Sequence, residues 1–366
     1  MDVIKSKVLV GTIHNLHIGG AQKMMISILN YFSTQAFEVH LIVFTSDGIL
    51  KRELAENIIV HELNSTSIGK GMFKCLKLIH KLKASVIFSG IGHLNLALAP
   101  FIPFMKRLLP HSKWIARETN IVSLQNKDSK YPKLFDWLYR NYYDNYDKVI
   151  VQSEDMKKDL KINYGVANSI VINNPLNIEK IKKLANLSLE TEFNKDKINL
   201  LSVAGLRKEK RHDLMLEVIS LLPIQYHLTI VGSGEKEVTL KKLAQDLKIE
   251  NRITFLGYQV NPYTYMKRAD LFLLTSEREG FPNVLLEANA LGLPIIAFAC
   301  KGGIEEIINQ GVNGFYVPFS KSKTMAKKIE EASIYNFNTN SIIEYTIKSY
   351  SYENILSKYK EIFLNK

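Results

Sequence analysis

The sequence contains only two cysteines and no apolar run long enough to cross a bilayer. Cys75 and Cys300 stand far apart in apolar surroundings and form neither a CxxC pair nor a Cys/His cluster, which argues against a disulfide scaffold and a zinc site. The longest apolar candidate, LNLALAPFIPFM, is too short to span a membrane and contains two prolines. The amino-terminal run VLVGTI fits a buried strand better than a signal peptide. These absences predict a cytoplasmic protein with two buried thiols.

Acidic residues are missing between Glu62 and Glu118, although nine basic residues occur there. Residues 1–185 carry 25 Lys and Arg against 15 Asp and Glu, a net charge of +10, whereas residues 186–366 carry 23 against 21. Basic and apolar residues alternate in GMFKCLKLIHKLK, a helix-like pattern with a basic face. Such a face is either simply solvated or contacts an anionic surface or a phosphate-bearing substrate. No recognisable nucleic-acid motif or aromatic ladder accompanies the charges, so a nucleic-acid partner is not expected.

The chain of 366 residues is long enough for two α/β domains. Short buried strands alternate with helical patterns from KVLVGTI onward and again from INLLSVAG onward. This alternation predicts two parallel sheets covered on both faces, and therefore two tandem doubly wound, Rossmann-like domains. The polar stretch 184–197 marks the boundary, so we expect domains at 1–185 and 196–349. The amphipathic tail 350–366 is predicted to be a helix that packs back on the first domain.

Loops that follow strands are where chemistry is expected, because ligands of doubly wound sheets bind at the carboxyl ends of the strands. Gly19 and Gly20 follow the first strand and open a helix, which makes either an anion site or simply a tight turn. Arg207 and Lys210 follow the first strand of the second half. A guanidinium and an ammonium suit a diphosphate, although RKEKR could also be a solvated run. With two sheets, we expect the site in the cleft where these ends face each other.

In the stretch SEREGFPNVLLEANALGLPIIAF, Glu279 and Glu287 stand eight positions apart. Glu279 lies in a loop that leaves a strand, and Glu287 lies about one turn inside the following helix, which ends at Gly292. The amides of the turn between them, with the positive helix end, can receive phosphates. Carboxylates accept two hydrogen bonds at once, so both glutamates suit the hydroxyls of a sugar and a ribose. The alternatives are a helix-terminal acid at Glu279 and a surface residue at Glu287.

This stretch resembles the E-x7-E signature of family-four retaining glycosyltransferases, which have the GT-B fold. Other segments follow in the family's order, among them IGGAQKMM, VIVQSEDMKKDL, VINNPLN, VAGLRKEKRHDLML, IVGSGEKEVTLKKLA, ITFLGYQ and GGIEEIINQGVNGFYV. The sequence departs from the family in two places. Ala204-Gly205 stands where the family often has Gly-Arg, so Arg207 would replace the usual arginine, and the proline of the family's GGxPE is missing at Ile304-Glu305.

The resemblance implies a role for each matching position. Arg207 and Lys210 would hold the donor diphosphate and stabilise the leaving group, Glu279 would bind hydroxyls of the donor sugar, and Glu287 would bind the ribose. His93, after a first-half strand, would line the sugar pocket or be structural. The other positions expected to contact donor or acceptor are Gly280, Phe281, Pro282, Asn283, Gly232, Gly257 and Tyr258 for the donor, and Gly19, Gly20, Arg117 and Asn120 for the acceptor or phosphates.

The resemblance also implies a function. It implies a retaining transferase that moves a hexose or N-acetylhexosamine from a UDP-sugar and needs no metal or other cofactor, because cationic side chains and helix amides replace a divalent ion. Together with the basic first half, it implies a lipid-linked saccharide acceptor and a peripheral position on the inner face of the cell membrane, in the synthesis of a surface glycan such as O-antigen or capsule. The rival readings are a nucleotide-sugar epimerase of the same architecture, a secreted two-lobed sugar-binding protein, which would need a signal peptide, and a basic nucleic-acid binder.

Overall fold

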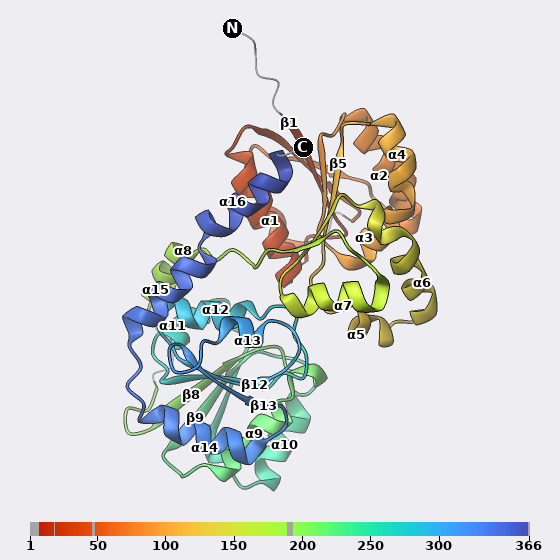
Figure 1. Cartoon of the computed structure of the whole chain (residues 1–366). Helices are drawn as coiled ribbons and strands as arrows, with labels where there is room; N and C mark the ends of the chain where they lie inside the picture. Colours follow the sequence, from red (N-terminus) through yellow and green to blue (C-terminus); the bar gives the residue numbers. More distant parts are fainter. Residues whose placement is uncertain (1–6, 18, 46–47, 189–192, 365–366) are drawn as a thin grey trace. The chain divides into compact units, whose positions relative to one another are not determined.

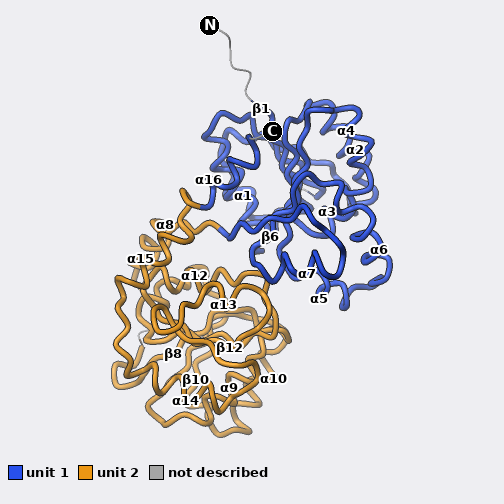
Figure 2. Tube along the Cα trace, in the orientation of Figure 1, with its two compact units in different colours: residues 1–174, 355–366 blue, residues 175–354 orange. Residues whose placement is uncertain are grey.

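The computed structural model describes residues 7–17, 19–45, 48–188 and 193–364 (Figure 1). The chain divides into two compact units, unit 1 with residues 1–174 and 355–366, and unit 2 with residues 175–354 (Figure 2). The sequence placed the boundary at 184–197, a stretch that lies partly outside the described residues. The division falls earlier because helix α8 (Ile178–Ala185) buries Ile178 and Ile181 in the core of unit 2.

Unit 1 is built on a seven-stranded parallel sheet with the strand order β3-β2-β1-β4-β5-β6-β7. Its strands are β1 (Lys7–Ile13), β2 (Phe37–Val43), β3 (Ile59–Glu62), β4 (Val86–Ser89), β5 (Lys113–Arg117), β6 (Lys148–Val151) and β7 (Ser169–Val171). One face is covered by α2 (Ile68–Lys81), α3 (Gly92–Leu98), α4 (Ile102–Leu108), α6 (Pro132–Tyr142) and α7 (Glu154–Tyr164), with α5 (Val122–Lys127) beside them. Helices α1 (Gly20–Ser33) and α16 (Tyr352–Leu364) lie on the other face.

Unit 2 contains a six-stranded parallel sheet in the order β10-β9-β8-β11-β12-β13. Its strands are β8 (Ile198–Val203), β9 (Tyr226–Val231), β10 (Ile253–Gly257), β11 (Leu271–Leu274), β12 (Ile295–Ala299) and β13 (Gly314–Pro318). Helices α9 (His212–Leu221), α10 (Glu237–Asp246) and α14 (Ser322–Ser333) pack on one face. The other face carries α8, α11 (Tyr263–Met266), α12 (Asn283–Ala290) and α13 (Ile304–Ile307), and α15 (Thr339–Tyr350) packs against α12.

Both sheets reverse their direction of winding once. In unit 1 the reversal lies between β1 and β4, and in unit 2 it lies between β8 and β11, strands that are hydrogen-bonded neighbours although far apart in sequence. The loops that leave the two strands at such a point diverge to opposite faces and open a crevice outside the carboxyl edge. The topology therefore marks one position in each unit for a ligand.

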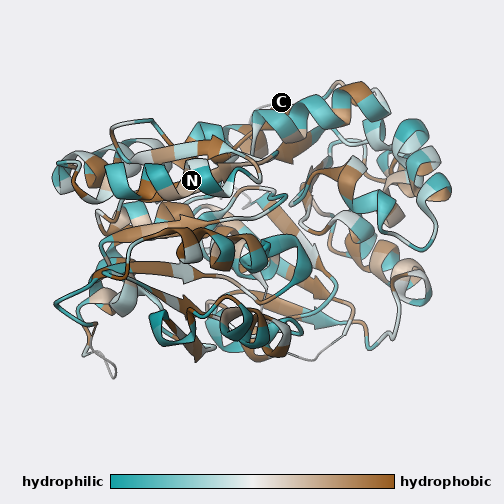
Figure 3. Cartoon of the chain, turned by 90° about the horizontal axis from the view of Figure 1, so that it is seen from below, coloured by the Kyte–Doolittle hydropathy of each residue, from teal (hydrophilic) through white to brown (hydrophobic). Residues whose placement is uncertain are grey.

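The predicted tandem of doubly wound parallel sheets is confirmed. Figure 3 shows strands coloured mainly as hydrophobic, whereas the helices alternate between hydrophobic and hydrophilic residues, as expected for sheets buried on both faces. The edge strands β3 and β7 were not predicted, because neither contains a buried residue and neither therefore shows the apolar run of a central strand. The prediction of two buried thiols is right for Cys75, while Cys300 is partly exposed.

The predicted carboxyl-terminal helix is confirmed as α16, whose residues 355–364 complete the core of unit 1. Its apolar face buries Ile355, Leu356, Tyr359 and Phe363. The Phe363 ring lies 4.7 Å from that of Phe32 in α1, centroid to centroid. Unit 1 is therefore assembled from segments separated in sequence by the whole of unit 2.

Arg117, the last residue of β5, links these segments by hydrogen bonds. Its side chain is fully buried, Nε donates a hydrogen bond to the Tyr359 hydroxyl at 3.2 Å, and Nη2 donates to Oδ1 of Asn174. Asn174 is the last residue of unit 1 before the chain crosses to unit 2, and Tyr359 lies in α16 after the chain has returned. A buried guanidinium needs such partners, since an unpaired charge in this position would cost several kcal/mol.

We expect Tyr359→Phe to loosen α16. The substitution removes a hydrogen bond to a buried charge and should lower the stability of the helix–sheet contact by about 2 kcal/mol. Amide hydrogen exchange of residues 352–364 should become faster, and the melting temperature should fall. Lys360→Ala, on the exposed side of the same helix, is the control and should change neither. Unchanged exchange in Tyr359→Phe would show that the aromatic packing alone holds α16.

Candidate active site

The predicted residues Lys210 and Glu279 form an ion pair at the reversal point of the second sheet. Lys210 lies in the loop that leaves β8, and Glu279 lies in the loop that leaves the neighbouring strand β11. Nζ of Lys210 is 2.6 Å from Oε1 of Glu279, and the side chains are 24% and 11% exposed. The pair is thus largely shielded from bulk solvent, and its charges are less screened than those of a fully exposed pair. Both side chains nevertheless remain partly accessible to a ligand.

Backbone contacts fix the two loops against each other. The fully buried Thr275, at the end of β11, donates its hydroxyl to the carbonyl oxygens of Lys210 and Arg211 at 3.1 and 3.0 Å. The amide of Glu277 donates to the carbonyl oxygen of Glu209 at 2.9 Å. Thr275 was not among the predicted residues, because nothing in the pattern of a buried strand marks its last hydroxyl. These bonds hold the ion pair in place before any ligand arrives.

The loop after β12 holds the backbone of Glu279 in position. The amide of Glu279 donates to the carbonyl oxygen of Lys301 at 3.2 Å. At Gly302, which has a φ of +110°, a Cβ atom would lie 1.7 Å from the carbonyl oxygen of Glu279. Only glycine therefore permits this approach. The glycines of the sequence GGIEE set the position of the first glutamate.

The second glutamate, Glu287, lies inside α12 as predicted. Its Oε1 accepts a hydrogen bond of 3.4 Å from the hydroxyl of Tyr263, the first residue of α11. Tyr263 was not predicted, because it lies in a segment that carries no recognisable motif. Helix α12 begins at Asn283 and has no capping side chain, so the positive end of its dipole faces the same loop as Glu279.

The turn at 280–283 can contact a ligand through its backbone rather than through its apolar side chains. Gly280, Phe281 and Pro282 are buried, and the Phe281 ring packs 5.9 Å from that of Tyr350. The Phe281 ring also fills the space that a Cβ atom at Gly303 would need. The apolar side chains of this predicted donor segment therefore shape the loop from the core side.

The other predicted donor residues lie in loops that leave the same sheet edge. Arg207 is exposed, precedes the turn that carries Lys210, and has no acidic partner within the described ranges. Gly257 adopts a φ of +70° with open space around it, and its carbonyl oxygen accepts the amide of Gly232 at 2.8 Å. Tyr258, next to it, is 58% exposed. These residues share this edge of the sheet with the ion pair of Lys210 and Glu279.

His212, which follows this loop as the first residue of α9, is buried and stays neutral. Its ring is 2% exposed, and neither ring nitrogen has a hydrogen-bond partner within the described parts of the chain. Burial, aided by the nearby Lys210 ammonium, lowers the pKa of His212 to about 4. A neutral imidazole next to Lys210 adds no competing positive charge to the site.

In unit 1 the predicted residues also leave the carboxyl edge of the sheet. Gly19 precedes α1, whose amino terminus has no capping side chain, and Gly20 is the first residue of that helix. His93 lies in the first turn of α3, exposed, with its ring centroid 5.9 Å from that of Phe135. Asn120 is exposed in the loop after β5. Gly19 and His93 follow β1 and β4, the two strands at the reversal point.

Arg117 does not fit the predicted contact with an acceptor, because its guanidinium is buried against Tyr359 and Asn174. Its neighbour Glu118 was not singled out, although it is the first acid after the acid-free stretch. The Glu118 carboxylate is buried and accepts hydrogen bonds from Asn95 and from the hydroxyls of Tyr139 and Tyr143. Burial raises the pKa of Glu118, while these donors oppose the shift.

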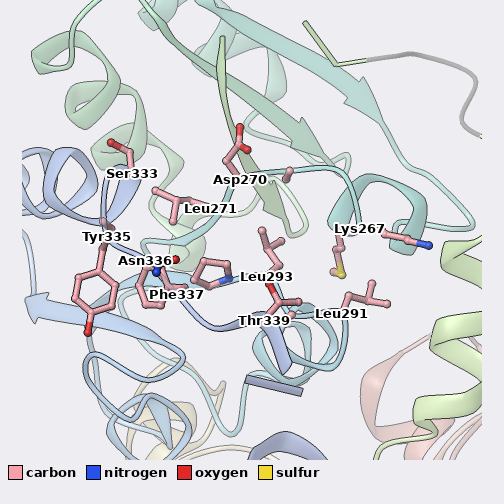
Figure 4. A pocket seen from close by; sticks show the side chains of 15 residues that line it. Lys267, Asp270, Leu271, Leu291, Leu293, Ser333, Tyr335, Asn336, Phe337 and Thr339 are labelled. Carbon is pink, nitrogen blue, oxygen red and sulfur yellow. The ribbon is translucent and has the colours of Figure 1, made fainter. Parts of the chain in front are cut away.

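A cavity of about 350 Å³ opens at the other edge of the second sheet (Figure 4). It is lined by the segments that enter β11 and β12 and by the stretch after α14, including Asp270, Leu293, Tyr335 and Phe337. This is the amino-terminal edge, so the cavity lies away from the loops that carry Lys210 and Glu279. Within the described ranges, no cluster of three or more His, Cys, Asp or Glu side chains is placed to hold a metal ion, and no helix is long and apolar enough to cross a membrane.

Two family models match the sequence. The model described as "Glycosyl transferases group 1" matches residues 185–349, and the model described as "Glycosyltransferase Family 4" matches residues 18–180. An uncharacterized glycosyltransferase of Methanocaldococcus jannaschii is 28% identical over 67% of this chain and 63% of its own length. The N-acetylgalactosamine-N,N'-diacetylbacillosaminyl-diphospho-undecaprenol 4-alpha-N-acetylgalactosaminyltransferase of Campylobacter jejuni is 26% identical over 86% of each chain.

Among solved structures, Anabaena HepE in complex with UDP-glucose resembles the chain with a TM-score of 0.76 and 20% identity, covering 97% of this chain and 98% of HepE. At that identity the likeness concerns the fold. The two sheets and their helices have the GT-B architecture, as the sequence predicted.

We expect the buried imidazole of His212 to make folding sensitive to acid. The unfolded ring has a pKa near 6.5 and the folded ring one of about 4. The stability is therefore fully present above pH 6.5 and is lost as the pH falls toward 4, by up to about 3 kcal/mol. Compared with His212→Phe, the wild-type melting temperature should fall more steeply between pH 6.5 and 4. A constant difference in melting temperature between wild type and His212→Phe across that range would show that the ring does not titrate in this way. The control is His80→Phe, which replaces an exposed ring on α2.

Proposed function

Because the chain belongs to the glycosyltransferases of family 4, we propose that it is a retaining, metal-independent transferase that moves a hexose or N-acetylhexosamine from a UDP-sugar to a lipid-linked saccharide. The observation that carries this proposal is the ion pair of Lys210 and Glu279, 2.6 Å apart, with Glu287 in the helix that follows. A cation that binds diphosphate and two carboxylates that bind hydroxyls are the groups that a nucleotide sugar requires.

The donor would lie along the carboxyl edge of the second sheet. The Lys210 ammonium has three N–H donors and uses one on Glu279, so two remain for phosphate oxygens. The exposed Arg207 guanidinium can add a planar fork to the same diphosphate. Glu279 would accept from sugar hydroxyls, and Glu287, held by Tyr263, from the ribose. Gly257 and Tyr258 would lie near the base.

Catalysis would depend on stabilising the leaving diphosphate. Negative charge grows on the diphosphate as its bond to the anomeric carbon breaks, and the cations of Lys210 and Arg207 favour that state. The departing phosphate oxygen would accept the proton of the acceptor hydroxyl on the same face of the sugar, so that configuration is retained. No protein nucleophile takes part in this scheme. His93, Gly19, Gly20 and Asn120 of unit 1 would serve the sugar and the acceptor.

The choice of donor and acceptor is supported by the similar proteins. HepE was solved with UDP-glucose, and the name of the Campylobacter jejuni enzyme specifies a diphospho-undecaprenol saccharide as its acceptor. A polyprenyl-linked acceptor would place the enzyme on the inner face of the cell membrane as a peripheral protein, in the synthesis of a surface glycan such as O-antigen or capsule. The excess of basic residues in the first half fits an anionic membrane surface.

We expect UDP or a UDP-sugar, alone among nucleotides, to raise the melting temperature. At a hundredfold excess over its dissociation constant, a ligand stabilises the folded state by about 2.7 kcal/mol. The shift should be the same with and without EDTA and should be much smaller in Glu287→Ala. Glu250→Ala, an exposed acid in η5 (Glu250–Arg252), should keep the full shift. A shift that EDTA abolishes would contradict metal independence, and no shift with any nucleotide would remove the donor assignment.

We expect Lys210→Met and Glu279→Gln each to lower kcat roughly a hundredfold, the scale seen when one preorganised charge-stabilising group is removed. Because the two side chains contact each other, the double variant should lose less than the product of the single losses. The matched control is Lys208→Met, an exposed lysine of the same turn, which should retain activity. Turnover is measured as glycolipid formed from UDP-sugar. Strictly multiplicative losses would mean that the pair does not act as a unit.

The same assay separates the transferase from an epimerase of similar architecture. An epimerase would convert the nucleotide sugar when no acceptor is present, and its product would remain attached to the nucleotide. The proposed enzyme should release UDP only when a lipid-linked acceptor is added, apart from slow hydrolysis.

A further inference from the structure

The outer face of α2 combines lysines with a largely exposed aromatic ring. Phe73 is 82% exposed. It lies between Lys70 and Lys77, which are exposed on the same side of the helix, while Met72, Cys75 and Ile79 face the core. The hydrophobic side of this helix is thus already satisfied, and Phe73 is an additional apolar group directed to the surface.

The next segment repeats this combination. The turn η2 (Ala99–Phe101) and helix α4 expose Phe104 at 58%, Leu108 at 44% and Phe101 at 38%. Arg107 is exposed beside them. Since Ile102 and Met105 fill the core side of α4, the exposed rings have no packing partner in the unit's core cluster.

Helix α6 continues the pattern. Trp137 and Leu134 are each 50% exposed, and Tyr131, just before the helix, is 53% exposed. The exposed basic residues Lys133 and Arg140 lie among them. The helix has one acid, Asp136, which turns inward and accepts hydrogen bonds from Tyr164 at 2.8 Å and from Asn126 at 3.1 Å.

These helices adjoin one another on one side of the first sheet. Helix α2 contacts α4, η2 leads into α4 and contacts α6, and all of them cover the same sheet face (Figure 1). We call the exposed side of α2, η2, α4 and α6 the aromatic–basic face. Helices α2 and α4 contain no acidic residue, so the face is positive throughout these two helices.

We propose that the aromatic–basic face inserts its apolar side chains into the interfacial region of an anionic phospholipid bilayer. Aromatic rings favour the depth of the headgroups, and lysine and arginine stems can lie along apolar surface while their charges reach lipid phosphates. A second copy of the chain does not suit this face, because two positive faces would repel each other. The inference rests on the proposed function in one respect, namely that the acceptor is a membrane lipid.

Intrinsic fluorescence offers a direct test, because the chain has only two tryptophans. Trp114 is fully buried, whereas Trp137 lies on the aromatic–basic face. With vesicles containing phosphatidylglycerol, we expect the emission of the full-length protein to shift to shorter wavelength. Vesicles of phosphatidylcholine alone should give little shift. The variant Trp137→Phe should still sediment with the anionic vesicles but lose the shift.

Two sets of variants separate insertion from simple charge attraction. Phe73→Ser with Phe104→Ser should weaken vesicle binding at least roughly tenfold, since each ring loses an apolar contact. The matched control is Val238→Ser with Ile334→Ser, which removes two side chains of unit 2 that are 82% and 88% exposed, and it should bind as wild type. Lys70→Gln and Lys77→Gln should each weaken binding about fivefold, the effect of one basic residue near an anionic surface.

Vesicle binding that is unaffected by the phenylalanine substitutions, or that high salt abolishes completely, would overturn insertion in favour of charge attraction alone. A shift of Trp137 emission that depends on protein concentration without vesicles would assign the face to self-association instead. The UDP-induced melting shift is measured on every variant. If that shift is missing from the wild type while vesicle binding is intact, the transferase proposal fails and the membrane face remains.

Discussion

The position of every candidate ligand-binding loop depends on one constraint, namely that both sheets are entirely parallel. Parallel strands need a crossover after each strand, so all loops that leave the strands gather at one edge, while helices cover the two faces. The strand order then selects a single point on that edge. Lys210 and Glu279 are 69 residues apart in sequence, and they meet because β8 and β11 are neighbours in the sheet. The strand order brings the two loops together, and the contacts of Thr275 and Gly302 then fix their exact positions.

Electrostatics divides the two units more sharply than their folds do. In the second half of the chain the charges are nearly balanced, with 23 Lys and Arg against 21 Asp and Glu in residues 186–366, and the buried His212 stays neutral beside the ammonium that pairs with Glu279. In unit 1 the buried charges of Arg117 and Glu118 are enclosed by amide and hydroxyl groups, and the positive charges collect on an outer helical layer. The two units thus have similar folds, but their charges form a local ion pair in unit 2 and an extended basic surface in unit 1.

The sequence predicted the parts of the fold that repeat a strong pattern. Buried central strands, the helix with the E-x7-E spacing and the amphipathic tail all carry such patterns. The edge strands β3 and β7 do not, because neither contains a buried residue. The polar stretch near residue 190 was a weaker boundary signal than the core contacts of Ile178 and Ile181. Arg117 was misjudged because its position after a strand resembles that of a ligand-binding residue. Its burial depends on α16, some 240 residues later, a contact that no local pattern encodes. Glu118 and Tyr263 were not predicted either, because their hydrogen-bond partners lie in other elements and no sequence motif marks them.

The return of α16 to unit 1 has a consequence for synthesis. A chain leaves the ribosome from its amino terminus, and domains generally fold as they emerge. Unit 1 cannot do this fully, because Tyr359 and Phe363 are parts of its core and are translated after the whole of unit 2. Until then, the faces of Phe32 and Phe88 that meet Phe363 remain uncovered. The half of the protein made first is therefore the half completed last, and a nascent chain has an exposed apolar surface for which chaperones can compete.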